Sequence, residues 1–263
     1  MRPQLLRVYD SELRVNPPPQ VGVVFEHVDG VLRARGAANW IFARDLDAAN
    51  VDAVVTREAD FFRRLGEDVE WKVYGHEAAI DLPTRLAAHG FEPDESETLM
   101  FLDLAAWRLS FTPPEGIQIR RVTDQQGVRD LVSVMSEAFG GDPDDNRWMF
   151  DELKATCLAS NPIVFGYVAY CEQTPVAAGR METAQGYAFA SIWGGCTVPA
   201  FRHRGIFRAL VCIRVEEASR RAHAYMSVDA AKTSKPILER LGFCPITSVT
   251  GWKLRARQKP AKF

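Results

Sequence analysis

The chain carries the same local unit twice: a short helix-like run ends in a glycine and is followed directly by an apolar strand-like run. The first unit ends in Gly90-Phe91 and the second in Gly242-Phe243. Glycine commonly ends helices because it adopts the left-handed backbone conformation without steric cost. The preceding strand-like stretches also correspond, residues 69–74 with residues 224–228. The repeat predicts two related halves, with a coincidental match between two glycine-capped helices as the alternative.

A basic loop in the second half joins a strand-like run to a helix-like run. Residues 191–198 form a short apolar stretch, and from Ile206 onward apolar residues recur at helical spacing. The loop between them contains Arg202, Arg204 and Gly205. The first-turn N–H groups of a helix lack intrahelical acceptors, and the helix dipole adds to their attraction for anions. The pattern predicts a site for a phosphorylated ligand, and an ordinary surface loop is the alternative.

With the basic loop and the Leu-Gly-Phe ending at Phe243, residues 116–254 resemble the GCN5-related N-acetyltransferase (GNAT) superfamily. The acetyl-coenzyme A signature of that family is Gln or Arg, two residues, Gly, one residue, then Gly or Ala. Arg202 and Gly205 match this signature, whereas Phe207 is bulkier than the third residue. The resemblance implies an α/β fold of the α+β mixed-sheet kind, with a central mixed β-sheet flanked by helices and two related halves.

The resemblance also implies an order of elements. The expected strands are residues 117–122, 163–171, 175–183, 187–198, 224–228 and, near the end of the chain, 249–254. The expected helices are residues 126–139, 145–159, 205–222 and 234–241.

Acetyl-coenzyme A (acetyl-CoA) is the cosubstrate that the resemblance implies. In the family its pantetheine arm lies between two splayed strands, and one backbone N–H polarises the thioester carbonyl. The residues assigned to cofactor binding are Cys196, Thr197, Val198, Arg202, His203, Arg204, Gly205, Ile206, Phe207, Arg208 and Ser234. His203 is equally interpreted as a solvated loop residue, and Cys196 as a small core residue rather than an acyl-accepting nucleophile.

The catalytic acid and base of the family are replaced in this sequence. Leu238 stands where many members have a tyrosine acid, and Ser191 where many have a glutamate base. A hydroxyl orients water but is a weak base at neutral pH. The candidates near the expected cleft are Glu182, Asp229, Tyr187 and Ser234. We select Asp229 or Glu182 as the base, with Ser191 as a water-orienting residue, and solvated carboxylates at strand ends are the alternative.

The first half lacks the basic loop, because no Arg-x-x-Gly pattern occurs between Arg44 and Thr56. We therefore interpret residues 1–110 as a degenerate GNAT-like domain that shapes the acceptor cleft. Residues 111–116 contain two prolines, which suits a stiff linker. Residues 117–263 are the expected catalytic GNAT domain.

An acidic segment follows the first expected helix of the second half. Residues 140–145 contain three aspartates, and Asp151 and Glu152 follow closely. An acidic rim attracts a cationic amine, which predicts a small-molecule or peptide amine as acceptor. Helix capping by Asp144 and Asp145 is the alternative explanation.

Composition narrows the remaining classes. A formal net charge of −2 argues against a general nucleic-acid binder, so the basic stretch 253–262 is interpreted as a frayed terminus. We expect no membrane span, because no apolar run approaches about 18 residues, and no signal peptide, which favours a cytoplasmic monomer or homodimer. Five cysteines without Cys-x-x-Cys spacing predict neither a metal site nor a disulfide framework.

The sequence therefore predicts an N-acetyltransferase that moves an acetyl group directly from acetyl-CoA to a primary amine. The alternative is a non-catalytic acyl-CoA-binding sensor or regulatory module of the same fold, which Leu238 and Ser191 favour. Phe207 and Trp193 leave the length of the acyl chain open.

Overall fold

The computed structural model describes residues 2–109, 111–141 and 147–256, and it divides into two compact units. Unit 1 comprises Met1–Leu99 with Ile246–Phe263, and unit 2 comprises Met100–Pro245. Most of the acidic segment 140–145 and most of the basic stretch 253–262 lie outside the described residues.

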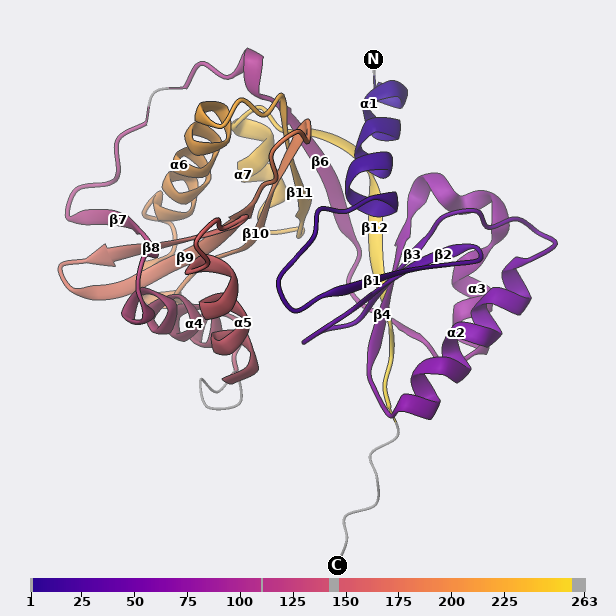
Figure 1. Cartoon of the computed structure of the whole chain (residues 1–263). Coiled ribbons are helices and arrows are strands. Elements are labelled where there is room, and N and C mark those ends of the chain that lie inside the picture. Colours follow the sequence, from indigo (N-terminus) through magenta and orange to yellow (C-terminus); the bar gives the residue numbers. More distant parts are fainter. Residues whose placement is uncertain (1, 110, 142–146, 257–263) are drawn as a thin grey trace, which may run out of the picture. The chain divides into compact units, whose positions relative to one another are not determined.

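Unit 1 is a mixed sheet with helices packed along it (Figure 1). Its strands run in the order β1 (Val24–Val28), β2 (Val31–Arg35), β3 (Trp40–Ala43), β4 (Val69–Tyr74) and β12 (Cys244–Leu254), and β5 (Glu92–Pro93) also pairs with β12. Its helices are α1 (Arg2–Tyr9), the π-helical η1 (Asp10–Val15), α2 (Val51–Leu65), the 3₁₀ turn η2 (Gly75–Ile80) and α3 (Leu82–Ala88). Trp71 of β4 and Phe62 of α2 are fully buried between sheet and helices, and they form the centre of this core.

The strands of unit 2 run in the order β11 (Tyr225–Ala230), β10 (Phe189–Thr197), β9 (Thr174–Glu182), β8 (Val164–Cys171) and β7 (Ile117–Arg121), and their directions are mixed. The chain enters it through β6 (Glu97–Asp103) and the 3₁₀ turn η3 (Leu104–Ala106). Its other helical elements are α4 (Gln125–Phe139), α5 (Arg147–Cys157), the 3₁₀ turn η4 (Pro199–Phe201), α6 (Ile206–Arg220) and α7 (Lys235–Arg240). In Figure 1, α4 and α5 lie on one side of the sheet and α6 on the other. These bounds confirm the α/β mixed sheet that the sequence predicted.

The two units repeat one topology. In each, a helix connects two parallel neighbouring strands, β3–α2–β4 in unit 1 and β10–α6–β11 in unit 2. The glycine-ended helices also match in detail, since Gly90 and Gly242 both have positive φ values, +78° and +92°. The following N–H donates five residues back in both cases, from Phe91 to the Leu86 carbonyl and from Phe243 to the Leu238 carbonyl, each at 3.0 Å. The repeat is therefore structural and not a coincidence of sequence.

The last strand differs from its expected place. Residues 249–254 of β12 pair antiparallel with β4, from Val249 opposite Tyr74 to Leu254 opposite Val69, and so complete the sheet of unit 1. The sequence placed this strand in the second half because its alternating pattern fits either sheet. Leu254 and Trp252 pack into the core of unit 1, which is the physical reason for the pairing.

The boundary between the units also lies earlier than the expected linker. The division falls after Leu99, so residues 111–116 lie inside unit 2. Trp107 and Phe111 explain this position, because both side chains pack against the core of unit 2 and anchor the segment there. None of the helices in the described part of the chain has the length and apolar character needed to cross a membrane.

Ending the chain after Pro245 is expected to unfold unit 1 selectively, because β4 loses its antiparallel partner. Hydrogen exchange should show that the amides of β4 lose protection, whereas those of β8 and β9 keep it. A chain that ends after residue 256 retains β12 and serves as the control. Equal loss of protection in β8 and β9 would show that β12 is not specific to unit 1.

Candidate functional site

Two parallel strands separate at the centre of unit 2. β10 and β11 pair in register only from Phe189 opposite Tyr225 to Ser191 opposite Ser227. Beyond Ser191, β10 continues to Thr197, and in this stretch it pairs with β9 on its other side. The strand edge from Ile192 to Thr197 therefore faces away from β9 and leads directly into the basic loop.

A bulge interrupts this strand next to its open edge. The register with β9 shifts between Trp193 opposite Arg180 and Cys196 opposite Ala178, so that Gly194 and Gly195 together oppose Gly179. Gly194 has a φ of +58°, which glycine adopts without strain. A bulge bends a strand and re-aims its backbone groups, and a pair of glycines in a strand is a sequence signal for one.

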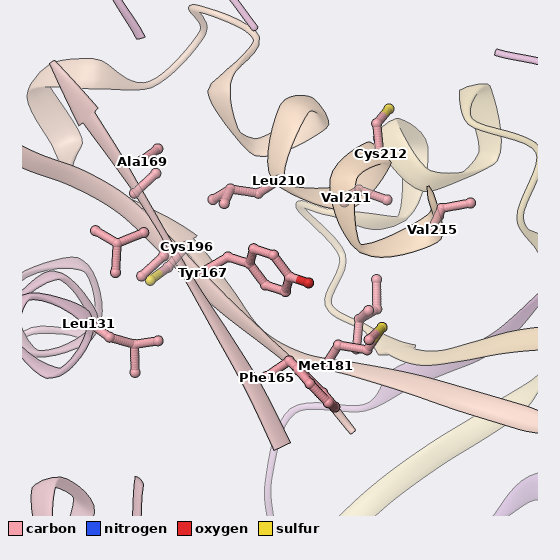
Figure 2. Close-up of a cluster of buried hydrophobic side chains, with 14 of the residues drawn as sticks. Leu131, Phe165, Tyr167, Ala169, Met181, Cys196, Leu210, Val211, Cys212 and Val215 are labelled. Atoms are coloured by element: carbon pink, nitrogen blue, oxygen red, sulfur yellow. The ribbon is translucent and has the colours of Figure 1, made fainter. Parts of the chain in front are cut away.

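The two bulge glycines lie against opposite helices. A Cβ atom on Gly194 would lie 3.0 Å from Met135 Cε of α4, whereas one on Gly195 would lie 2.9 Å from Phe207 Cε2 of α6. Figure 2 shows the same division, with Leu131 of α4 on one side of the strands and the α6 residues on the other. The bulge thus packs against α4 on one face of the sheet and against α6 on the other.

The basic loop presents backbone donors at the start of α6. His203 and Gly205 have φ values of +64° and +79°, and Gly205 is the residue that precedes the helix. The Ala209 N–H donates to the Gly205 carbonyl at 3.0 Å, so the preceding N–H groups of this turn point out of the helix. His203, Arg204 and Arg208 are exposed around them. Positive side chains and the helix dipole therefore act together at this end.

The residues that the sequence assigned to cofactor binding form two groups: those exposed in the basic loop, and those that hold the surrounding structure in place. The Arg202 guanidinium donates to the Thr197 carbonyl at 3.1 Å and to the Ala138 carbonyl at 3.4 Å, which ties the end of β10 to the end of α4. Ile206 is buried in the core, as are Cys196, Thr197 and Val198 at the end of β10. Ser234 precedes α7, and its hydroxyl donates to the Ala231 carbonyl at 3.1 Å.

Phe207 departs from the family signature without filling the loop. Its ring lies against the backbone of Gly195, where any side chain would collide with it. Gly205 remains exposed, and its nearest neighbour outside the local chain is Pro114 Cγ, 3.7 Å from a Cβ built on the glycine. The bulky third residue of the signature is therefore accommodated by a glycine in β10.

Charged side chains gather on the α4–α5 face beside the bulge. Arg180 Nη1 would lie 3.7 Å from a Cβ on Gly194, and Arg180 Nε donates to Glu182 Oε1 at 3.4 Å. Burial raises the pKa of Glu152 on α5, Arg180 opposes this shift, and the Glu182 carboxylate adds to it. The sequence assigned Glu182 to the site but placed Glu152 only on an acidic rim. No sequence pattern indicates that α5 lies beside β9, so the position of Glu152 near Glu182 was not predicted.

The three residues predicted to be catalytic share this face. Ser191 is the register partner of Glu182, and cross-strand partners point to the same side of a sheet. The hydroxyls of Ser191 and Ser227 lie 2.7 Å apart and are buried, and Asp229 follows two residues after Ser227 on β11. Because Ser191 is held by Ser227, it acts as a fixed hydrogen-bonding group.

Neither Cys196 nor Leu238 supplies a catalytic acid or base. Burial raises the pKa of the Cys196 thiol to about 11, so the thiol is protonated at neutral pH and is a poor nucleophile. This agrees with its interpretation as a core residue. Leu238, at the position of the family's tyrosine, is buried and apolar.

The corresponding loop of unit 1 has a different chemistry. It joins β3 to α2, and three of its N–H groups donate to side chains of the same loop. The Asp47 carboxylate accepts the N–H groups of Ala49 at 2.8 Å and Asn50 at 2.9 Å, while the Asn50 side chain accepts the Asp47 N–H at 3.0 Å. An acidic loop whose donors are occupied is unsuited to a phosphate.

No protein-family model matches the sequence, and no curated protein matches it significantly. Solved structures match over most of the chain. A GCN5-related N-acetyltransferase from Kribbella flavida is 14% identical, with a TM-score of 0.67 over 88% of this chain and 89% of that chain. One from Sphaerobacter thermophilus is 14% identical, with a TM-score of 0.62 over 96% and 84%. A tandem GNAT protein from the clavulanic acid biosynthesis pathway is 12% identical, with a TM-score of 0.61 over 92% and 86%. The chain has the tandem GNAT fold.

Gly195→Ala is expected to destabilise unit 2 by about 1–3 kcal/mol, because the new methyl group collides with Phe207 and overpacks the site. Phe207→Ala in the same chain should recover part of this loss, since it removes the colliding ring. Denaturant unfolding of both single variants and the double variant measures the coupling. Strictly additive effects would show that the ring and the glycine do not interact.

Proposed function

We propose that the protein is an N-acetyltransferase that transfers the acetyl group of acetyl-CoA directly to a primary amine of a small molecule or peptide. The observation that carries this proposal is the separation of β10 from β11 after Ser191, immediately before a basic loop that opens α6. The first feature offers an open strand edge to an extended arm. The second offers N–H groups and arginines to phosphates at the end of the same strand.

The basic loop and the open strand edge bind different parts of acetyl-CoA. The exposed Arg204 and Arg208 and the first-turn N–H groups of α6 bind the pyrophosphate of acetyl-CoA. The pantetheine arm then runs back along β10, and its amide groups pair with the open edge of residues 192–197. This course brings the thioester to the bulge at Gly194 and Gly195, where backbone N–H groups polarise its carbonyl.

The acceptor amine approaches from the α4–α5 face, where Glu152, Glu182 and Asp229 supply negative charge. The amine nitrogen attacks the carbonyl carbon, the C–S bond breaks, and coenzyme A leaves as a thiolate. Glu152 accepts the proton that the nitrogen loses, because its raised pKa makes it a stronger base than an ordinary carboxylate. Glu182, which forms an ion pair with Arg180, contributes to that raised pKa of Glu152.

The absence of a tyrosine at Leu238 is compatible with this chemistry. A thiol has a pKa of about 8.5, so a thiolate leaves without prior protonation and takes its proton from solvent. Holding the amine against a polarised thioester therefore supplies most of the rate.

A non-catalytic acyl-CoA sensor remains the second candidate function. The buried Leu238 and the Ser191–Ser227 pair favour it, because neither family acid nor family base is present at those positions. A sensor binds acetyl-CoA but releases no free thiol with any amine.

Reversing the charge of the basic loop should weaken acetyl-CoA binding by at least about tenfold, because two charge-assisted contacts to phosphate are lost. The variant is Arg204→Glu with Arg208→Glu, and calorimetry of acetyl-CoA binding is the measurement. Arg129→Glu on α4 changes an exposed arginine elsewhere and serves as the control. Unchanged affinity in the loop variant would remove the pyrophosphate site from the account.

Glu152→Gln should lower kcat about 100-fold or more while leaving the acetyl-CoA Kd unchanged, because it removes the proton acceptor alone. Free-thiol release in an amine screen measures the rate. In the wild type, kcat/KM should rise with pH through the raised pKa of Glu152, and the variant should lack this rise. Asp151→Asn changes the exposed neighbouring carboxylate and is the matched control.

The same substitution should stabilise the protein at neutral pH. The folded-state pKa of Glu152 lies above the unfolded one, so its contribution to stability is present at low pH and is lost as pH rises through the raised pKa. Full activity in Glu152→Gln would assign the proton transfer to another group. No gain in its stability at neutral pH would contradict the raised pKa of Glu152.

A further inference from the structure

Helix α6 contains a buried arginine that has no carboxylate partner in the described part of the chain. Arg214 is 1% exposed and is among the largest fully buried side chains of the protein. Its Nε donates to the Leu210 carbonyl at 2.8 Å and its Nη1 to the Arg180 carbonyl at 3.0 Å. Within residues 2–109, 111–141 and 147–256, no carboxylate forms an ion pair with it. Burying a charge against neutral acceptors alone opposes folding, so the residue is unlike an ordinary core side chain.

Two glycines make room for this guanidinium at the bulge. A Cβ on Gly179 of β9 would lie 2.8 Å from Arg214 Nη1, and one on Gly195 of β10 would lie 3.3 Å from Arg214 Nη2. These are the residues that face each other where the register shifts. The charge therefore lies directly behind the bulge, on the α6 face, opposite the side from which Arg180 and Glu182 approach.

The surroundings leave the positive charge uncompensated. Burial lowers the pKa of Arg214 to about 10, so the side chain is still charged at neutral pH. The titratable groups around it are Tyr167 on β8, Cys196 on β10 and Cys212 on α6, and Figure 2 shows the Tyr167 ring directed toward α6. Burial raises the pKa of Tyr167 to about 12 and those of the two thiols to about 11. All three groups are therefore neutral at pH 7.

We propose that Arg214 is a positioning residue whose charge acts through the bulge of β10: it polarises the thioester carbonyl held there and stabilises the negative charge that the carbonyl oxygen develops. The inference rests on the proposed function, and it adds a cation on the helix face to the backbone donors of the strand. Charges act strongly in such a site because little water screens them. The amine adds to the carbonyl carbon, the electron pair moves to oxygen, and it returns as the C–S bond breaks.

A purely structural role is the competing explanation. Arg214 donates to two carbonyls, and a neutral donor of similar length fulfils that task equally well. Only the electrostatic role requires the charge itself. The test must therefore report on the charge at the carbonyl and not on folding.

Isotope-edited infrared spectroscopy of bound acetyl-CoA provides this report. The difference between unlabelled and carbonyl-13C-labelled acetyl-CoA isolates the C=O stretch of the bound thioester, and no acceptor is needed. We expect a lower frequency in the wild type than in free acetyl-CoA, and a return toward the free value in Arg214→Met. An unchanged frequency in a folded Arg214→Met that binds acetyl-CoA overturns the inference.

Arg214→Lys keeps the test decisive if the methionine variant does not fold. A buried lysine has a lowered pKa and loses its charge as pH rises, whereas arginine keeps it. The carbonyl frequency of this variant should therefore rise between about pH 6 and 9, while that of the wild type stays constant. A carbonyl frequency in Arg214→Lys that stays equal to that of the wild type at a pH where titration of the variant shows the lysine to be neutral contradicts the electrostatic role.

The outcomes separate this inference from the function on which it rests. A wild type that fails to bind acetyl-CoA overturns the proposed function and the role of Arg214 together. A wild type that binds acetyl-CoA, with a carbonyl frequency that is the same in all three proteins, overturns only the role of Arg214.

Discussion

The two-against-one bulge in β10 is the constraint on which the site depends. Gly194 and Gly195 oppose the single residue Gly179, and none of the three carries a side chain. Phe207 and Arg214 occupy the space that side chains would take on the α6 face. The first turn of α6, and with it the basic loop, therefore packs against β10 at Gly195, a position that requires glycine. A larger residue in β10 would displace the helix end that we propose as the binding site of the donor.

The bulge also separates two kinds of charge. On the α6 face lies the buried cation Arg214, which has no ion-pair partner among the described residues. On the α4–α5 face lie the carboxyl groups of Glu152 and Glu182, together with Arg180, which forms an ion pair with Glu182. Both Arg214 and Glu152 are held in environments that disfavour their charged forms. Groups perturbed by burial gather at functional sites, because stability is given up there for reactivity. This separation is the basis of the roles that we propose for Arg214 and Glu152 in acyl transfer.

The sequence predicted the features that depend on local chemistry. The basic loop, α6 and the glycine-ended helices are set by residues close together in the chain, and the structure contains all of them. Long-range pairing was not predictable in the same way. β12 has an alternating pattern that suits either sheet, and only its packing into unit 1 decides between them. Arg214 was also missed, although it follows Ile206 and Leu210 at four-residue intervals, on the buried face of α6.

The central claim is that one strand edge and the helix end that follows it form a single acetyl-CoA site. Hydrogen–deuterium exchange of the full chain, with and without acetyl-CoA, measures this directly. We expect protection in residues 194–197 and 205–208 together, with no change in residues 44–50, where the side chains of Asp47 and Asn50 accept the N–H groups of Asp47, Ala49 and Asn50. Absence of protection in both segments, or protection confined to residues 44–50, would contradict it.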